Sequence, residues 1–324
     1  MCPGQGSQTP GFLTPWLELP GVREQLELLA EAAGTDLLTH GTTSDADTIR
    51  DTAVAQPLIV SASLLSLRAL LDGRDAADVV DVTAGHSVGE FAAVAVAGVL
   101  EDGSAVGLVA ERARAMASAA ALEPTGMSAV VGGDADEVLA AIERAGLWPA
   151  NVNGGGQVVA AGSLDGLARL AAEPPARARV IPLQVAGAFH TPFMQPALDA
   201  FAPVADGWPA SAPRVTLLSD ADGEPYGADA GGHASGASGH VVLTRLAAQI
   251  VAPVRWDLCQ GSLLRLGVTG LVELAPGGVL TGLARRTLPG VETVAVKTPA
   301  DLDAARELMT RHSGAPRTTK ETSA

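Results

Sequence analysis

The sequence is poor in cysteine and has no uninterrupted apolar run of membrane length. Its 324 residues include two cysteines, Cys2 and Cys259, which make no disulfide framework, so we expect free thiols in a reducing compartment. Charged side chains interrupt each long apolar stretch before it reaches the ~18 residues of a membrane span. The first residues, Met1-Cys2-Pro3-Gly4-Gln5, show neither the basic segment nor the apolar core of a secretory signal. These absences predict a cytoplasmic protein without membrane contact.

Basic charge is also scarce. Lysine and arginine together number 21 against 36 aspartates and glutamates, which gives a formal net charge of −15. This balance argues against a nucleic-acid binder and against docking on anionic lipid, because both functions need a basic face. A local basic patch, such as Arg285 with Arg286, remains open as a contact for an anionic ligand.

Motifs for metal and phosphate binding are missing as well. No spacing of cysteine, histidine and acidic residues suggests a metal site. The glycine-rich segment Gly4-Gln5-Gly6-Ser7-Gln8 lacks the lysine of a phosphate-binding loop, although its backbone N–H groups could form an oxyanion hole. We therefore expect neither a metal nor a cofactor.

The elements that the sequence does predict belong to an α/β protein. A chain of this length can bury a full core, and 47% of its residues are hydrophobic. Residues 20–75 are rich in Ala, Leu and Glu and predict helices. The β-branched run Val79–Ala84 predicts a buried strand that ends at Gly85, and Val88–Val99 predicts a helix soon afterwards. A strand–turn–helix arrangement is therefore expected around His86.

A self-contained pattern interrupts this large domain. Between residues 125 and 186 the sequence predicts a strand, a helix, two strands, a helix and a strand, the βαββαβ order of a ferredoxin-like unit. The Gly/Ala/Ser-rich stretch 221–240 predicts a long exposed loop. The predicted division is a large domain at 1–124 and 187–311, an inserted small domain at 125–186, and a disordered tail at 312–324.

The strongest local signal for chemistry is Gly85-His86-Ser87-Val88-Gly89, a GxSxG motif between the predicted strand and helix. This context is the one that a nucleophile elbow requires, because the tight turn holds the serine hydroxyl at a helix N-terminus. With 37 glycines in the chain, a plain tight turn is the alternative. Ser87 is the candidate nucleophile.

A serine nucleophile needs a base, and His190 is the histidine best placed by the pattern. It follows the predicted strand Ala178–Val185 through Gly187-Ala188-Phe189. Thr191-Pro192 then predicts a helix start. Functional groups of α/β folds gather at the C-terminal ends of strands, which favours His190 as the base over a polar loop residue.

Arg112 lies on the apolar face of its predicted helix, with Leu108 four residues before it and Met116 four residues after it. A buried guanidinium must find a partner, because an unpaired buried charge is costly. The partner is either an internal Asp or Glu or a carboxylate that the substrate brings. The residues alone leave both alternatives open.

The motifs are more specific together than singly. In chain order they are Gly4-Gln5-Gly6-Ser7-Gln8, Gln56-Pro57, Gly85-His86-Ser87-Val88-Gly89-Glu90, Arg112, Asn153 with Gln157, Gly187-Ala188-Phe189-His190 and Pro276-Gly277-Gly278. In this order the sequence resembles the malonyl-CoA:acyl carrier protein transacylases of bacterial type II fatty acid synthesis, especially the actinobacterial form. The resemblance extends over residues 3–310, nearly the whole chain.

The resemblance implies a fold and a set of site residues. The fold is an α/β-hydrolase-like large domain with a ferredoxin-like insert. Ser87 becomes the nucleophile and His190 its general base, in a dyad without an acidic third member. The further implied roles are oxyanion-hole N–H groups from Gln5 and Val88, substrate contacts from Arg112, Gln56, Phe189 and Asn153, and the Arg255 backbone carbonyl that orients His190.

The implied reaction is ping-pong transfer of malonyl from malonyl-CoA to the phosphopantetheine thiol of acyl carrier protein, through an ester on Ser87. Phe189 matches the pattern that goes with malonyl in related polyketide acyltransferases, because a bulky ring narrows the space for an α-methyl group. Malonyl-CoA and the carrier protein are the expected partners. We expect the enzyme to be a monomer.

Two alternatives remain. A serine esterase or thioesterase shares the GxSxG motif, but it gives no reason for a buried Arg112 and normally has an acidic triad member. An activity-impaired paralogue is suggested by the start of the chain, where Met1-Cys2-Pro3 stands in place of the family's first strand. A missing strand would expose its neighbour in the sheet and loosen the loop that carries Gln5.

Overall fold

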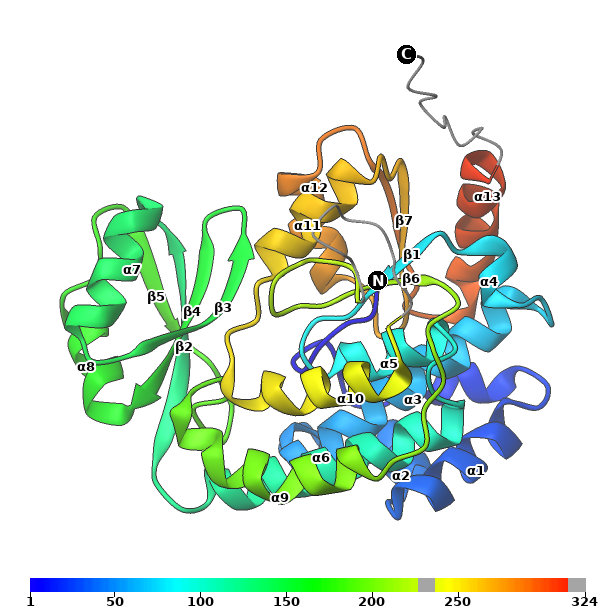
Figure 1. The fold of residues 1–324 in the computed structure, drawn as a ribbon, viewed down its shortest axis with the longest axis horizontal. Helices are drawn as coiled ribbons and strands as arrows, with labels where there is room; N and C mark the ends of the chain where they lie inside the picture. Colours follow the sequence, from blue (N-terminus) through cyan, green and yellow to red (C-terminus); the bar gives the residue numbers. More distant parts are fainter. Residues whose placement is uncertain (227–236, 314–324) are drawn as a thin grey trace.

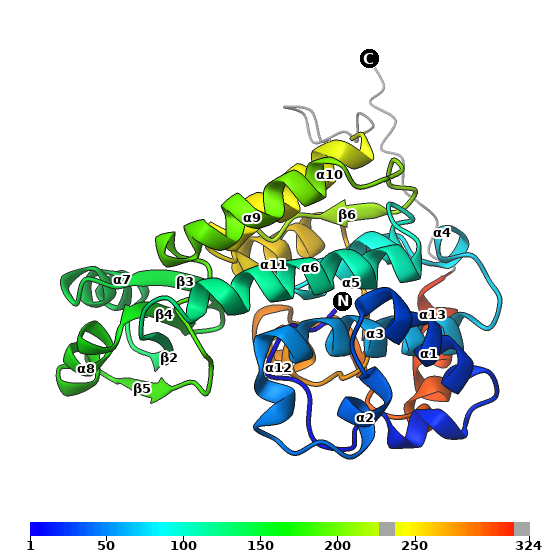
Figure 2. The ribbon, with the colours of Figure 1, turned by 90° about the horizontal axis from the view of Figure 1, so that it is seen from below.

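The protein has an α/β fold in which a small sheet domain stands beside a larger body (Figure 1). The computed structural model describes residues 1–226 and 237–313. The small domain is the stretch from β2 to β5, drawn in green, and the chain enters and leaves it on the side that faces the larger body. Figure 2 shows the same separation from below, with α6 and α9 side by side at the junction.

The small domain is one four-stranded antiparallel sheet with two helices. Its strands lie in the order β3-β4-β2-β5, and α7 and α8 cover the face turned away from the larger body (Figures 1 and 2). Each helix starts at a side-chain cap, Asp134 for α7 and Ser163 for α8. The elements are β2 (Thr125–Gly132), α7 (Ala135–Arg144), β3 (Trp148–Gly154), β4 (Gln157–Ser163), α8 (Leu164–Ala172) and β5 (Ala178–Pro182).

The larger body is built around short parallel strands. β1 (Val82–Ala84) pairs with β6 (Thr216–Leu218), and β7 (Gly270–Glu273) pairs with β8 (Glu292–Ala295). The first two residues of the chain join these pairs. Cys2 N donates to the Ala84 carbonyl over 2.9 Å, while Leu274 N donates to the Met1 carbonyl over 3.0 Å. Met1 and Cys2 therefore occupy the strand position between β1 and β7, so both neighbours are hydrogen-bonded there.

Helices surround these strands. The longest, α3, is apolar and long enough to cross a membrane, yet 83% of its apolar window is buried inside the protein, as in the core helix of a globular domain. The α-helices are α1 (Val22–Ala33), α2 (Leu37–Thr42), α3 (Thr52–Leu71), α4 (Ala76–Val79), α5 (Gly89–Val96), α6 (Asp102–Ala120), α9 (Gln195–Asp206), α10 (Gly239–Ala248), α11 (Trp256–Arg265), α12 (Val279–Thr287) and α13 (Leu302–His312). Short 3₁₀ turns are Thr14–Glu18, Thr48–Arg50, Pro192–Met194, Gln249–Val251 and Pro299–Asp301.

Some elements differ from the sequence prediction at their ends. α10 begins at Gly239, inside the stretch expected to be a loop, because the Ser238 hydroxyl accepts a hydrogen bond from Val241 N and caps the helix. β5 ends at Pro182, before the predicted end at Val185, although Leu183 N still donates to the Met127 carbonyl over 2.9 Å. Residues 227–236 of the predicted loop and 314–324 of the predicted tail lie outside the described residues.

Candidate active site

Ser87 occupies a sharp turn between β1 and α5. Its backbone φ is +52°, a left-handed conformation that is rare for a residue with a side chain. A Cβ at Gly85 would lie 2.1 Å from the Gly89 carbonyl carbon, and one at Gly89 would lie 2.2 Å from the Cys2 oxygen. Both glycines of the motif are therefore required sterically. The Ser87 N–H donates to Asp220 Oδ2 over 2.7 Å, and this hydrogen bond holds the strained turn in place.

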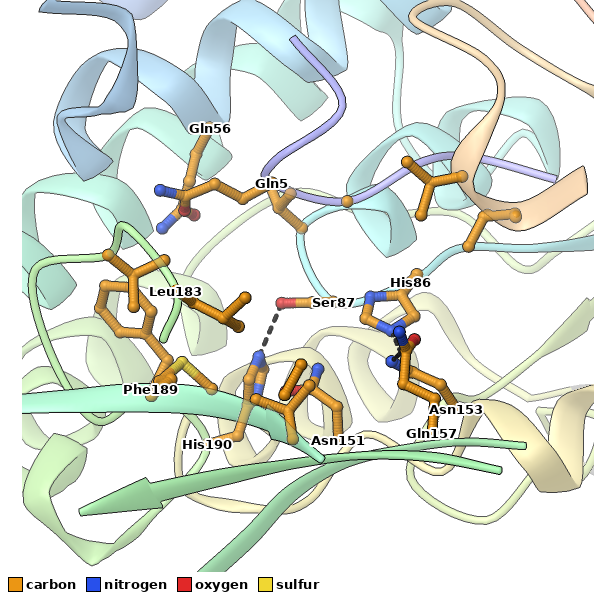
Figure 3. Close-up of a pocket in the computed structure, with 18 of the residues that line it drawn as sticks. Gln5, Gln56, His86, Ser87, Asn151, Asn153, Gln157, Leu183, Phe189 and His190 are labelled. Atoms are coloured by element: carbon orange, nitrogen blue, oxygen red, sulfur yellow. Dashed lines mark hydrogen bonds between the residues drawn. The ribbon is translucent and has the colours of Figure 1, made fainter. Parts of the chain in front are cut away.

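His190 lies directly opposite this turn, as Figure 3 shows. Its Nε2 is 2.7 Å from Ser87 Oγ, and its Nδ1 is 2.9 Å from the backbone carbonyl of Gln249. A carbonyl only accepts hydrogen bonds, so Nδ1 carries the proton and Nε2 presents its lone pair to the Ser87 hydroxyl. This is the tautomer that a general base for Ser87 needs.

The prediction that Arg255 supplies this carbonyl is wrong. Gln249 supplies it, as the first residue of the 3₁₀ turn Gln249–Val251 that follows α10. The Arg255 carbonyl instead accepts hydrogen bonds from Leu258 N and Cys259 N, as the first carbonyl of α11. Because the chain has already turned into a new helix at Arg255, that oxygen points along the helix axis and away from His190.

Burial sets the protonation state of His190. The side chain is 4% exposed, and loss of solvation, aided by the nearby Arg112 charge, lowers the pKa of His190 to about 3. The imidazole is therefore neutral across the physiological pH range. A neutral imidazole can accept the Ser87 proton as soon as an acyl group is in place.

Arg112, on α6, is buried against the same pocket. Its Nη1 donates to Gln56 Oε1 over 2.6 Å and its Nη2 to Gln249 Oε1 over 2.7 Å. Both partners are neutral amides, and no carboxylate within the described residues forms an ion pair with this guanidinium. Burial lowers the pKa of Arg112 to about 10, so the group remains charged at neutral pH. Of the two alternatives left by the sequence, the geometry favours a ligand carboxylate as the counter-ion.

A pocket of about 210 Å³ joins these groups. Figure 3 shows it between the larger body, which contributes Ser87, and the sheet of the small domain. Residues of the larger body that line it are Gly4, Gln5, Gln56, His86, Ser87, Val88, Arg112, Met116, Val279, Leu280 and Leu283. Residues of the small domain and of the segment that leaves it are Met127, Ala129, Asn151, Asn153, Gln157, Val159, Leu183, Val185, Phe189 and His190. All predicted site residues except Arg255 thus meet at one cavity.

The two predicted oxyanion donors border the pocket beside Ser87. Gln5 lies in the loop above the serine (Figure 3), and Val88 is the next residue in the turn. Within residues 1–226 and 237–313, neither backbone N–H donates to a protein acceptor. The loop passes so close that a Cβ at Gly4 would lie 2.8 Å from the His86 carbonyl oxygen. The arrangement leaves two unused donors near the nucleophile.

Asn153 is held by the small domain and by the turn together. His86 Nε2 donates to Asn153 Oδ1 over 2.8 Å, and Asn153 Nδ2 donates to Gln157 Oε1 over 3.0 Å (Figure 3). The chain of hydrogen bonds connects the residue before Ser87 with strands β3 and β4. Asn153 is therefore a link between the two domains as well as a lining residue of the pocket.

Sequence reasoning missed three buried polar residues behind the serine. Gln249 donates through Nε2 to Glu90 Oε2 and Asp220 Oδ2, while its Oε1 accepts from Arg112. Glu90 follows the motif directly and starts an apolar helix, and Asp220 stands just past the end of β6. An acid inside an apolar run, and an acid at the C-terminal end of a parallel strand, are the two signals that could have pointed to them.

A half-buried serine bonded to a buried histidine, on one pocket with a guanidinium that forms no ion pair within the described residues, defines a serine-based acyl-transfer or acyl-hydrolysis site. The sequence matches the family described as acyl transferase domain over residues 1–302. It is 51% identical over 308 residues to "Malonyl CoA-acyl carrier protein transacylase" of Mycobacterium tuberculosis strain H37Rv, covering 94% of this chain and 97% of that protein. The protein of the same name from Escherichia coli K12 is 31% identical, with 94% and 97% covered.

Solved structures agree with the sequence matches. The crystal structure of MCAT from Mycobacterium tuberculosis has a TM-score of 0.86 with this chain at 50% identity, covering 94% of this chain and 98% of that one. A malonyl-transacylase solved in complex with a type II PKS acyl-carrier protein has a TM-score of 0.84 at 28% identity, covering 94% and 97%. The chain belongs to the acyl transferase domain family and, within it, to the malonyl CoA-acyl carrier protein transacylases.

Proposed function

We propose that this protein transfers a malonyl group from malonyl-CoA to the phosphopantetheine thiol of an acyl carrier protein, through an ester on Ser87. The observation that carries the proposal is the placement of the Ser87–His190 pair and the carboxylate-free Arg112 on one pocket. The relatives' names supply the substrates, since both the curated relatives and the solved structures are malonyl transacylases. The reaction needs its two substrates and no cofactor.

The transfer proceeds in two half-reactions of the same kind. Ser87 Oγ attacks the thioester carbonyl of malonyl-CoA while His190 Nε2 takes the hydroxyl proton. The N–H groups of Gln5 and Val88 stabilise the oxyanion, and the thiolate of CoA leaves with the proton from His190. The carrier-protein thiol then attacks the malonyl ester, with His190 as base, and Ser87 recovers its proton. The Gln249 carbonyl holds the imidazole in the required tautomer.

Arg112 selects the acyl group through its carboxylate. Its Nε has no hydrogen-bond partner within the described residues, although it is buried. The malonyl carboxylate supplies the missing acceptor and the counter-charge together, while Gln56 and Gln249 keep the guanidinium plane in place. An acyl group without a carboxylate, such as acetyl, leaves this donor unsatisfied, so binding of that acyl group is disfavoured.

Phe189 and Asn153 shape the remainder of the pocket. Phe189 is 6% exposed and lies beside His190 on the pocket wall (Figure 3), where its ring restricts the space near the acyl α-carbon. An α-methyl group is therefore disfavoured, by roughly 1–3 kcal/mol. Asn153 contacts the arm of the substrate that extends from the thioester towards the small domain.

The carrier protein approaches over α12. Val279, Leu280 and Leu283 of this helix line the pocket, while Arg285 and Arg286 on the same helix are exposed. A basic pair on a helix that lines the pocket suits the phosphate groups of both CoA and phosphopantetheine, although the whole protein has a net charge of −15. One chain supplies every group that lines the pocket, so the site needs no second copy, and we propose a monomeric enzyme of the cytoplasm.

The architecture follows the same proposal. The larger body is an α/β-hydrolase-like domain, supported by the serine turn between a parallel strand and a helix. The small domain is a ferredoxin-like insert, supported by its βαββαβ element order and its sheet order β3-β4-β2-β5.

The proposal is tested by intact-mass measurement after brief exposure to malonyl-CoA. The wild-type chain is expected to gain one malonyl group and to lose it when holo acyl carrier protein is added. Ser87→Ala is expected to gain none, while keeping the wild-type melting temperature. A folded wild-type chain without an adduct would exclude the transferase and favour an impaired paralogue. An adduct that water removes as fast as the carrier protein does would favour an esterase.

A further inference from the structure

Two carboxyl groups lie buried behind the nucleophile, and the transfer steps use neither of them. Asp220 is 0% exposed and Glu90 is 1% exposed. The amide nitrogen of Gln249 donates to both, reaching Glu90 Oε2 and Asp220 Oδ2 (3.0 Å), so the two carboxyls converge on one donor. The Asp220 N–H also donates to Glu90 Oε1 over 2.9 Å. Two negative charges that share one amide donor, away from solvent, would repel each other strongly.

The hydrogen bonds around the pair do not support two ionised groups. Glu90 accepts from the Tyr226 hydroxyl over 3.3 Å as well as from Gln249 and from the Asp220 backbone. Asp220 accepts from Ser87 N and Gln249 Nε2 at Oδ2, while its Oδ1 is buried without a partner among the described residues. An ionised carboxylate with a bare, buried oxygen is costly. One proton held by the pair removes one of the two charges and so lowers this cost.

We propose that Glu90 and Asp220 share one proton, and that in this state they position the Ser87 turn and leave Arg112 as the dominant charge facing the malonyl carboxylate. The effect on the malonyl carboxylate rests on the proposed function. The shared proton and its effect on the Ser87 turn do not depend on that function. Asp220 acts through the Ser87 backbone and through Gln249, so it is a positioning residue.

The charged and titratable groups around the pair support this state. Burial raises the pKa of both carboxyls, that of Asp220 to about 7, and the nearby Asp220 charge raises the pKa of Glu90 further. Arg112 lies one side chain away, bonded to Gln249 Oε1, and is the only cation that the pair meets through Gln249. The other titratable or charged groups nearby are His190, Tyr226, Arg245 and Cys259. Arg245 is bonded to Asp222 and lies over the Tyr226 ring, and the Cys259 thiol donates to the Ser219 carbonyl.

Loss of the shared proton has a defined consequence for the substrate. With one negative charge, the pair lies behind Gln249 and leaves Arg112 as the dominant charge next to the malonyl carboxylate. With two negative charges, the pair over-compensates Arg112 and repels the incoming carboxylate. We therefore expect the KM for malonyl-CoA loading to rise roughly threefold to tenfold between pH 6.5 and pH 9 in the wild type. Loading of acetyl-CoA, which has no carboxylate, should show no such rise in KM.

Asp220→Asn is the decisive variant. An asparagine keeps an oxygen for Ser87 N–H and supplies an N–H to Glu90, so it copies the shared-proton state at every pH. The native pair binds a proton that the unfolded chain releases near pH 4, so wild-type stability falls as the pH rises from about 4 to 7. The melting temperature of Asp220→Asn should therefore exceed that of the wild type by several degrees at pH 8 and by little at pH 5.

Two further variants separate the positioning of Ser87 by Asp220 from a general loss of stability. Asp220→Ala removes the acceptor for Ser87 N–H and should lower the loading rate constant roughly ten- to a hundredfold at all pH values, while Asp220→Asn restores it. Asp222→Asn is the matched control, since Asp222 is exposed, pairs with Arg245 and lies two residues away. It should leave both the pH dependence of melting and the KM unchanged.

The outcomes distinguish the two proposals. Parallel melting curves of the wild type and Asp220→Asn between pH 5 and pH 8, or an Asp220→Asn chain that does not fold, would overturn the shared proton. An equal rise in KM for acetyl-CoA would overturn its effect on the malonyl carboxylate. Absence of any malonyl adduct on the wild type would instead overturn the proposed function, and the melting series would still decide on the carboxyl pair.

Discussion

The two walls of the pocket are built in different ways. One wall holds the reactive groups by hydrogen bonds to buried partners: Ser87 by Asp220, and Arg112 by Gln56 and Gln249. His190, on the segment that leaves the small domain, belongs to this wall because the Gln249 carbonyl holds it. On the side of the small domain, most lining residues are apolar, namely Met127, Ala129, Val159, Leu183 and Val185. The first wall fixes atoms that react, whereas the second limits the volume that a substrate can occupy.

This difference predicts which property each wall controls. Substitutions in the hydrogen-bonded wall should lower the rate of acyl transfer by large factors, because they displace groups whose geometry decides the barrier. Substitutions in the apolar wall should change the choice between acyl groups by smaller factors, because apolar contacts discriminate weakly. Asn153 stands between the two cases, since it belongs to the small domain but bonds to His86 of the serine turn.

The largest effect is expected at His190. His190→Ala removes the base for Ser87 and should lower the loading rate constant by roughly 10²–10⁴-fold, measured by intact mass in single turnover. In the wild type the rate should stay flat from pH 7 down to about pH 5, because the His190 pKa of about 3 keeps the imidazole neutral. A loss of less than threefold, in a folded variant, would show that another group removes the serine proton.

The same depressed pKa affects stability. Below about pH 6.5 the unfolded chain binds a proton at His190 that the folded chain does not bind, so this residue destabilises the protein as the pH falls. His190→Ala should therefore lose less melting temperature between pH 7 and pH 5 than the wild type. An identical acid dependence of both chains would indicate that His190 becomes protonated in the folded protein.

Arg112 is expected to give the next largest effect. Arg112→Ala should lower malonyl loading roughly 10²-fold while acetyl loading is kept or improved, because the guanidinium contacts the carboxylate and not the reacting ester. Arg112→Lys is the matched variant: it keeps a charge but cannot bond to Gln56, Gln249 and a carboxylate at once. Loss of both activities to the same degree would assign Arg112 a structural role.

The contrast between the walls also explains what the sequence could predict. Ser87 lies in a motif of five neighbouring residues, and the first glycine is required by contacts within that window, so strand, turn and helix can be predicted from it. Arg112 stands out because a charge interrupts an apolar helical face. The helices of the small domain are likewise marked by local caps, Asp134 and Ser163.

The rest depends on contacts between residues far apart in the chain. Gln249 bonds to Ser87, Glu90 and Arg112, more than 130 residues away, and nothing near Gln249 in the sequence marks it. The choice of Arg255 failed for the same reason, because which carbonyl faces His190 depends on where the chain turns between two helices. Strand β8 was not predicted either, since it is defined by its pairing with β7 and not by a pattern of its own.

The smallest effect, and the sharpest test of the apolar wall, is expected at Phe189. Phe189→Ser should raise the loading of methylmalonyl-CoA relative to malonyl-CoA by roughly tenfold, because it opens space at the acyl α-carbon, while malonyl loading changes little. Phe193→Ser is the control, since that ring packs edge-on against Trp148 at a centroid distance of 5.5 Å and does not line the pocket. It should lower the melting temperature without changing the ratio. If Phe189→Ser lowered the rates with both substrates and left their ratio unchanged, Phe189 would belong with the hydrogen-bonded wall, as a support for the neighbouring His190.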